Sequence, residues 1–141
     1  MIGRNSVFVV LVLIGVALLG GPAGAEDLGL DVKTVGNISY VSGGVGVSDR
    51  QALEQVKSKF NLRLLFAYTK SGEFLADIPV KIVDGAGKSV LDAVSAGPYF
   101  YAKLPPGRYR VSADNEGQVQ TKSVTVSSSG AASEAFYWSR P

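Results

Sequence analysis

The amino-acid sequence predicts an all-β sandwich preceded by one short amphipathic helix. From residue 62 onward apolar and polar residues alternate, as expected for strands that bury one face. Turns rich in Gly and Pro recur about every ten residues, a spacing typical of sandwiches and barrels. Helical periodicity is found in residues 48–60, where Leu53, Val56 and Phe60 recur at three- and four-residue spacing.

Residues 1–25 have the pattern of a secretory signal peptide. Arg4 gives a short positive region, residues 7–19 are apolar apart from Gly15, and small residues precede a cleavage site after Ala25. The apolar run is short for a membrane span, which needs about 20 residues. We therefore expect a periplasmic or secreted protein with no membrane span after cleavage, with an uncleaved anchor as the alternative.

The composition of the chain excludes several classes of function. Neither Cys nor His occurs, so disulfides, thiolate or imidazole metal ligands and Ser-His or Cys-His catalytic pairs are excluded. The chain has 14 Lys and Arg against 12 Asp and Glu, and cleavage would remove only Arg4, which leaves a net charge of +1. Because these charges are scattered, nothing indicates nucleic-acid binding. We therefore expect that the protein is not an enzyme and that it has neither a metal site nor a cofactor.

The chain from residue 26 to 60 is expected to lead into the sandwich. Residues 26–47 are read as an extended, glycine-containing leader whose end is a candidate short strand at 37–41. Helix 48–60 follows, with Ser48 and Gln51 spaced as a capping box and Asp49 favourably placed in the first turn. Basic residues in its last turn suit the helix dipole.

Residues 61–141 are expected to form the sandwich itself, with seven strands separated by Gly-, Pro- or Ser-containing turns. The period-two segments are 62–69, 78–84, 89–95, 98–104, 108–114, 118–127 and 132–138.

The segment Ile78–Ala113 resembles the carboxypeptidase regulatory-like family. A strand ending near an aspartate, a Gly turn, a glycine before an aromatic and then Leu-Pro-Pro-Gly-x-Tyr-x-Val occur in that order; the matching residues are Asp84, Gly87, Asp92, Gly97, Leu104, Pro105, Pro106, Gly107, Tyr109 and Val111. The resemblance implies a seven-stranded Greek-key sandwich of prealbumin (transthyretin-like) topology. The chain is also similar to small secreted proteobacterial proteins that place a Gly-Gly-x-Gly loop and a helix before such a domain. The resemblance implies no particular activity.

Gly43, Gly44 and Gly46 form a glycine-rich loop before the helix. A phosphate-binding loop would need a lysine after the glycines, and Asp49 stands close to that place instead. The loop is therefore interpreted as backbone with positive φ or close approach to other backbone before the capped helix. A nest that binds a peptide or an anion is the alternative.

A second candidate contact surface combines tyrosines with basic residues. If Phe100, Ala102 and Leu104 face the core, then Tyr99, Tyr101 and Lys103 face outward. On the next strand in the sequence, taken as their partner, the outward residues are Arg108 and Arg110. Such a surface would suit sugar stacking or an acidic protein, although packing under the helix is the alternative.

These observations favour a non-catalytic binding or assembly module of the periplasm or of the secreted fraction. A protein of the cell envelope, or a second copy of the chain, is expected as the partner rather than a small molecule. The alternative function is a carbohydrate-binding module that uses an exposed tyrosine/arginine face, which requires Tyr99 and Tyr101 to be accessible.

Overall fold

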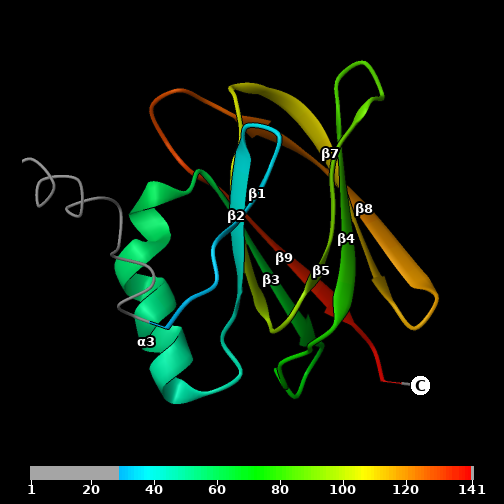
Figure 1. Ribbon diagram of the computed structural model, residues 1–141. Coiled ribbons are helices and arrows are strands. Elements are labelled where there is room, and N and C mark those ends of the chain that lie inside the picture. Colours follow the sequence, from blue (N-terminus) through cyan, green and yellow to red (C-terminus); the bar gives the residue numbers. More distant parts are fainter. Residues whose placement is uncertain (1–28, 141) are drawn as a thin grey trace, which may run out of the picture.

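The computed structural model describes residues 29–140, which form two β-sheets and one short helix arranged in three layers (Figure 1). The predicted signal peptide, residues 1–25, lies outside the described residues. Within residues 29–140 no helix is long and apolar enough to cross a membrane. The elements in chain order are β1 (Lys33–Val35), β2 (Ile38–Gly43), α3 (Val47–Val56), the 3₁₀ turn η1 (Lys57–Lys59), β3 (Leu62–Tyr68), β4 (Ile78–Asp84), β5 (Ser89–Ser95), β6 (Tyr99–Lys103), β7 (Gly107–Asn115), β8 (Gln118–Val126) and β9 (Ala132–Trp138).

The predicted all-β class is confirmed, but the described residues contain nine strands rather than seven. The two additional strands come from the segment expected to be an extended leader. Gly36 has φ of 61° in the turn between them, and β2 then pairs with β6 from Ser39 opposite Lys103 to Gly43 opposite Tyr99. The candidate strand at 37–41 thus corresponds to part of β2, which fills an interior position of a sheet, whereas β1 is not predicted by the sequence.

Two sheets enclose the main hydrophobic core. The five-stranded sheet has the order β1-β2-β6-β3-β9, in which β3 and β9 are parallel, and the four-stranded sheet has the order β5-β4-β7-β8. Phe66, Phe100 and Phe136 of the first sheet and Ile82 and Val111 of the second are fully buried in one cluster. Period-two alternation therefore gives each sheet one face in this core.

The helix covers the outer face of the five-stranded sheet beside β2 and β6 (Figure 1). The apolar stripe predicted for it, Leu53, Val56 and Phe60, is buried in a second cluster with Val41 and Tyr101. Burying a Leu or Val side chain contributes about 1.5–3 kcal/mol, so this cluster holds α3 onto the sheet.

The start of the helix differs from the prediction. Helix α3 begins at Val47 and has Gly46 as its N-cap, which makes no side-chain capping hydrogen bond. The predicted capping box of Ser48 and Gln51 is therefore absent. The carboxylate of Asp49 instead reaches back beyond the cap and accepts a hydrogen bond from the Gly44 N–H at 2.5 Å.

The pairing registers place four connecting segments at one end of the sandwich, which we call the η1 end. Leu62 at the start of β3 lies opposite both Ala102 and Ala132, so the segments 57–61, 103–107 and 127–131 meet there. Gly107 lies opposite Val126, and the end of β4 lies beside the start of β7, which adds the turn 84–88. The η1 end is uppermost in Figure 1.

Candidate functional site

The predicted tyrosine/arginine surface does not form. Tyr99, Tyr101 and Lys103 lie on β6 in the five-stranded sheet, whereas Arg108 and Arg110 lie on β7 in the four-stranded sheet. The prediction treated β6 and β7 as a hairpin. Residues 104–106 instead carry the chain from one sheet to the other, so strands adjacent in the sequence are not paired.

Tyr99 and Tyr101 take part in docking the helix. Phe100 and Ala102 face the core between the sheets, as predicted, which turns the two tyrosines toward the helix layer. Tyr101 is 7% exposed and its ring centroid lies 6.2 Å from that of Phe60. Tyr99 is half-buried and meets Phe74 edge to face at 5.8 Å. The accessible platform that the carbohydrate alternative requires is therefore missing at Tyr101.

Burial of Tyr101 predicts a loss of stability at alkaline pH. Burial raises the pKa of its phenol above the ordinary 10.0, and the nearby Glu54 carboxylate adds to this effect. The phenol of the unfolded chain releases its proton at a lower pH than the buried phenol does. The contribution of Tyr101 to the free energy of unfolding is therefore fully present below about pH 10 and is lost as the pH rises further. Urea unfolding at about pH 8 and about pH 11 should show a smaller alkaline loss for Tyr101→Phe than for the wild type. Equal losses would mean that the buried phenol does not contribute.

The glycine-rich loop brings backbone segments into close contact. The backbone of Gly43 lies against Gly97, where an added Cβ would overlap the Gly43 carbonyl. Gly44 has φ of 100°, and a Cβ there would overlap the Tyr99 ring. The predicted positive φ is thus confirmed at Gly43 and Gly44, and close approach to other backbone is confirmed at Gly43, whereas Gly46 is exposed and has open space around it.

The loop is not arranged as an anion nest in the described structure. The Gly44 N–H already donates to Asp49, as described above. The Arg50 Nη1 donates to the carbonyls of Gly44 at 3.0 Å and Val45 at 3.2 Å. These side chains stabilise the turn from β2 into α3.

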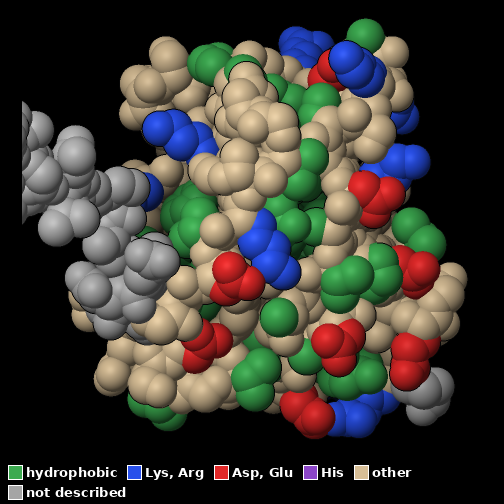
Figure 2. Space-filling model, in the orientation of Figure 1, with side chains coloured by type: hydrophobic (Ala, Val, Ile, Leu, Met, Phe, Trp, Pro, Cys, Tyr) green, Lys and Arg blue, Asp and Glu red, His purple; other side chains and the backbone are tan. Residues whose placement is uncertain are grey.

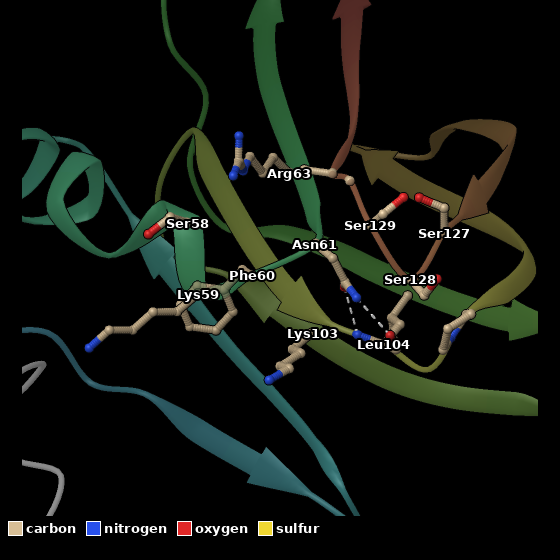
Figure 3. Close-up of a pocket in the computed structure, with 13 residues that line it drawn as sticks. Ser58, Lys59, Phe60, Asn61, Arg63, Lys103, Leu104, Ser127, Ser128 and Ser129 are labelled. Atoms are coloured by element: carbon tan, nitrogen blue, oxygen red, sulfur yellow. Dashed lines mark hydrogen bonds between the residues drawn. The ribbon is translucent and has the colours of Figure 1, made fainter.

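Three of the four segments at the η1 end line an open pocket of about 570 Å³ (Figure 3). Segment 57–61 follows the helix, segment 103–106 leads from β6 toward β7, and segment 127–131 leads from β8 to β9. The lining residues are Ser58, Lys59, Phe60, Asn61, Arg63, Lys103, Leu104, Pro106, Ser127, Ser128, Ser129, Gly130 and Ala131.

Asn61 holds the pocket together. Its side-chain Nδ2 donates to the Leu104 carbonyl and its Oδ1 accepts from the Leu104 N–H, both at 2.8 Å (dashed in Figure 3). Its backbone N–H donates to Ala102, and its carbonyl accepts from Ala132. One residue therefore joins the chain after η1 to residues 102–104 and to the first residue of β9, so the pocket is preorganised.

The charges around the pocket are all positive. Lys59, Arg63 and Lys103 line it, and no Asp or Glu is among the lining residues. Within residues 29–140 none of these three cations forms an ion pair. A hollow lined by charges of one sign attracts ligands of the opposite sign.

Arg63 is the most constrained of the three cations. Its Nη2 donates to the Lys57 carbonyl at 3.1 Å, while its Nε is buried and lacks a hydrogen-bond partner in the described part of the chain. Figure 3 shows Lys59 and Lys103 on one side of Asn61 and Ser127, Ser128 and Ser129 on the other. Serine hydroxyls can donate to an anion that the cations attract. The arrangement suits a carboxylate or another oxygen-rich anionic group.

Only Lys103 of the predicted site residues belongs to this pocket. Arg108 and Arg110 line a separate hollow of about 370 Å³ on β7 and β8. Among residues 29–140 no group of three or more Asp and Glu side chains is placed to hold a metal ion.

The sequence matches none of the protein-family models with which it was compared, and no curated protein matches it. The function is therefore inferred from the pocket itself.

Proposed function

We propose that this chain is a non-catalytic binding or assembly module, exported to the periplasm or secreted, whose partner is an acidic protein of the cell envelope. The observation that carries the proposal is the pocket at the η1 end, which Lys59, Arg63 and Lys103 line without any Asp or Glu among the lining residues. A partner carboxylate placed there would receive charge-assisted hydrogen bonds. Pro106 adds an exposed apolar side chain beside these cations, which a peptide can contact and an isolated ion cannot.

Export and the lack of catalysis are supported by the sequence. The signal-like residues 1–25 support export. The absence of Cys and His from the chain removes the usual nucleophile and base pairs.

We also propose a strand topology for the sandwich. We assign strands β3–β9 to a Greek-key domain of prealbumin topology, similar to the carboxypeptidase regulatory-like family, with β1, β2 and α3 as an N-terminal addition. The Leu-Pro-Pro-Gly-x-Tyr segment supports it, because the Tyr109 hydroxyl donates to the Pro105 carbonyl at 2.6 Å and so fixes the turn between the sheets.

The test is the affinity for a dye-labelled hexaglutamate peptide, measured by fluorescence anisotropy. The double variant Lys59→Gln/Lys103→Gln should bind it about tenfold more weakly than the wild type, since each exposed cation contributes up to about 1 kcal/mol. The matched control Lys70→Gln/Lys81→Gln removes the same charge outside the pocket and should bind as the wild type does.

Two results would contradict the proposal. Equal weakening of both double variants would show that only net charge matters. Binding of hexaglutamine as tightly as hexaglutamate would show that the anionic group is not recognised.

A further inference from the structure

The second hollow at the η1 end is also basic. Arg108 and Arg110 are two residues apart on β7, so their side chains share the outer face of the four-stranded sheet. The hydroxyl residues Ser123 and Thr125 of β8 line the hollow beside them. Within residues 29–140 neither arginine forms an ion pair. This hollow therefore combines cations with hydroxyl residues, as the pocket does.

Asp84 is the one acidic residue among those that line the second hollow, and it is already engaged. Its Oδ1 accepts hydrogen bonds from the N–H groups of Ala86 and Lys88, both at 2.9 Å. The carboxylate thus fixes the β4–β5 turn rather than pairing with the arginines.

The two hollows meet across a single pair of residues. Gly107 lies opposite Val126, and Pro106 and Ser127 on one side of this pair line the first pocket. On the other side, Arg108 lies opposite Thr125, and both line the second hollow. From Pro106 to Arg108 the chain advances about 7 Å, at about 3.3 Å per strand residue.

The Pro105–Pro106 turn, which lies between the two hollows, is held from both sides. Leu104 is held by the Asn61 side chain, and Pro105 accepts the Tyr109 hydroxyl. Figure 2 shows Lys and Arg side chains gathered toward the upper end of the molecule, while most Asp and Glu side chains in that view lie lower. A ligand laid across this turn would meet basic side chains on both sides of it.

We infer that the two hollows are subsites of one track, and that it binds an extended acidic segment of the partner protein laid across the Pro105–Pro106 turn. This inference rests on the proposed function and identifies the shape of the partner. A compact anion would occupy one hollow, whereas an extended peptide can place carboxylates in both. The aromatic rings that line the hollows, Phe60 and Tyr109, are 6% and 7% exposed, so neither hollow offers a stacking platform for sugar rings.

The experiment compares two peptides of equal length, about nine residues, which is enough to span both hollows. One has glutamates at both ends with glycines between them, and the other has glutamates at one end and glycines elsewhere. Each is titrated into the wild type, Arg108→Gln/Arg110→Gln, Lys59→Gln/Lys103→Gln and the control Lys70→Gln/Lys81→Gln. Thermal melting confirms that all four proteins are folded.

The wild type and the control should prefer the two-ended peptide by about tenfold, because the second contact becomes intramolecular. Arg108→Gln/Arg110→Gln should lose most of this preference. Its affinity for the one-ended peptide should change little, since the first pocket is intact.

The possible failures are distinguishable. If Arg108→Gln/Arg110→Gln still binds the two-ended peptide about tenfold more tightly than the one-ended peptide, the two hollows are not subsites of one track. The proposed function is not affected by that result. If neither peptide binds the wild type, the track and the proposed function are both wrong. Tighter binding of polygalacturonate or of phosphatidylglycerol vesicles than of either peptide would overturn the assignment of a peptide and indicate an anionic glycan or a lipid surface.

Discussion

Replacing Asn61 with Ala should lower the free energy of unfolding by about 3 kcal/mol, because two buried backbone groups lose their partners. Leu104 is 2% exposed, and its N–H and carbonyl are both satisfied by the Asn61 side chain at 2.8 Å. The wild type and the variant would be compared by urea denaturation. Affinity for hexaglutamate should fall as well, because Lys103 lies next to the released residue.

Two further variants separate this explanation from a general effect of changing the pocket. Ser58→Ala removes an exposed pocket hydroxyl with no hydrogen bond among the described side chains and should change stability by less than about 0.5 kcal/mol. Asn61→Asp keeps an acceptor for the Leu104 N–H but places a negative charge against the Leu104 carbonyl, so it should also be destabilising. An Asn61→Ala variant as stable as Ser58→Ala would show that Asn61 does not join the segments.

Gly97→Ala should destabilise the fold by about 2–3 kcal/mol, since the new methyl group overlaps backbone rather than a movable side chain. The Cβ would lie 2.9 Å from the Gly43 Cα and also too close to its carbonyl group. Relief requires the 96–98 turn to move away from β2, where the Ala96 N–H donates to the Ser42 hydroxyl at 3.0 Å. The midpoint of thermal unfolding measures the effect.

Gly85→Ala is the matched control for this substitution. At Gly85 the nearest atom to an added Cβ is the Arg108 carbonyl oxygen at 3.7 Å, an ordinary contact. This variant should be about as stable as the wild type. If Gly97→Ala were equally harmless, the contact between the 96–98 turn and Gly43 would not be a tight one.

Local sequence patterns were sufficient to predict most elements of the sandwich. The predicted strand 62–69 corresponds to β3 at Leu62–Tyr68, and the segments 78–84, 89–95 and 132–138 agree with β4, β5 and β9. These segments alternate apolar and polar residues, a property set by local burial. The candidate strand at 37–41 overlaps β2, but the sequence does not indicate β1. The place of both strands in the sheet depends on the pairing of β2 with β6, which is about 60 residues away in the sequence.

Strand pairing and the pocket could not be predicted in the same way. The alternation of residues places Arg108 and Arg110 on the same surface as Tyr99 only if β6 and β7 form a hairpin, but these strands lie in different sheets. Nothing local to Leu104-Pro105-Pro106 indicates that the chain changes sheets there. The glycine pattern was more informative, since the number of glycines around Gly43 exceeded the need of a helix cap and pointed to close backbone contact.

The pocket was missed for a related reason. It combines segments 57–61, 103–106 and 127–131, which the β3 and β6 pairings bring together. The sequence pattern indicates Lys103 as a candidate contact residue, whereas the position of Lys59 indicates only a charge favourable to the helix dipole. Asn61 lies between a helix and a strand, where a polar residue is ordinary, and its two hydrogen bonds depend on tertiary structure.

The most direct test of the central claim is an NMR titration of the isotopically labelled protein with hexaglutamate. Backbone amide shifts are expected to change most at Lys59, Asn61 and Lys103 and in the segment 127–130. Amides of the glycine-rich loop at 43–46, at the opposite end of the sandwich, should change little. Shift changes centred on that loop and Tyr99, or no changes at all, would contradict the assignment of the η1 end as the binding site.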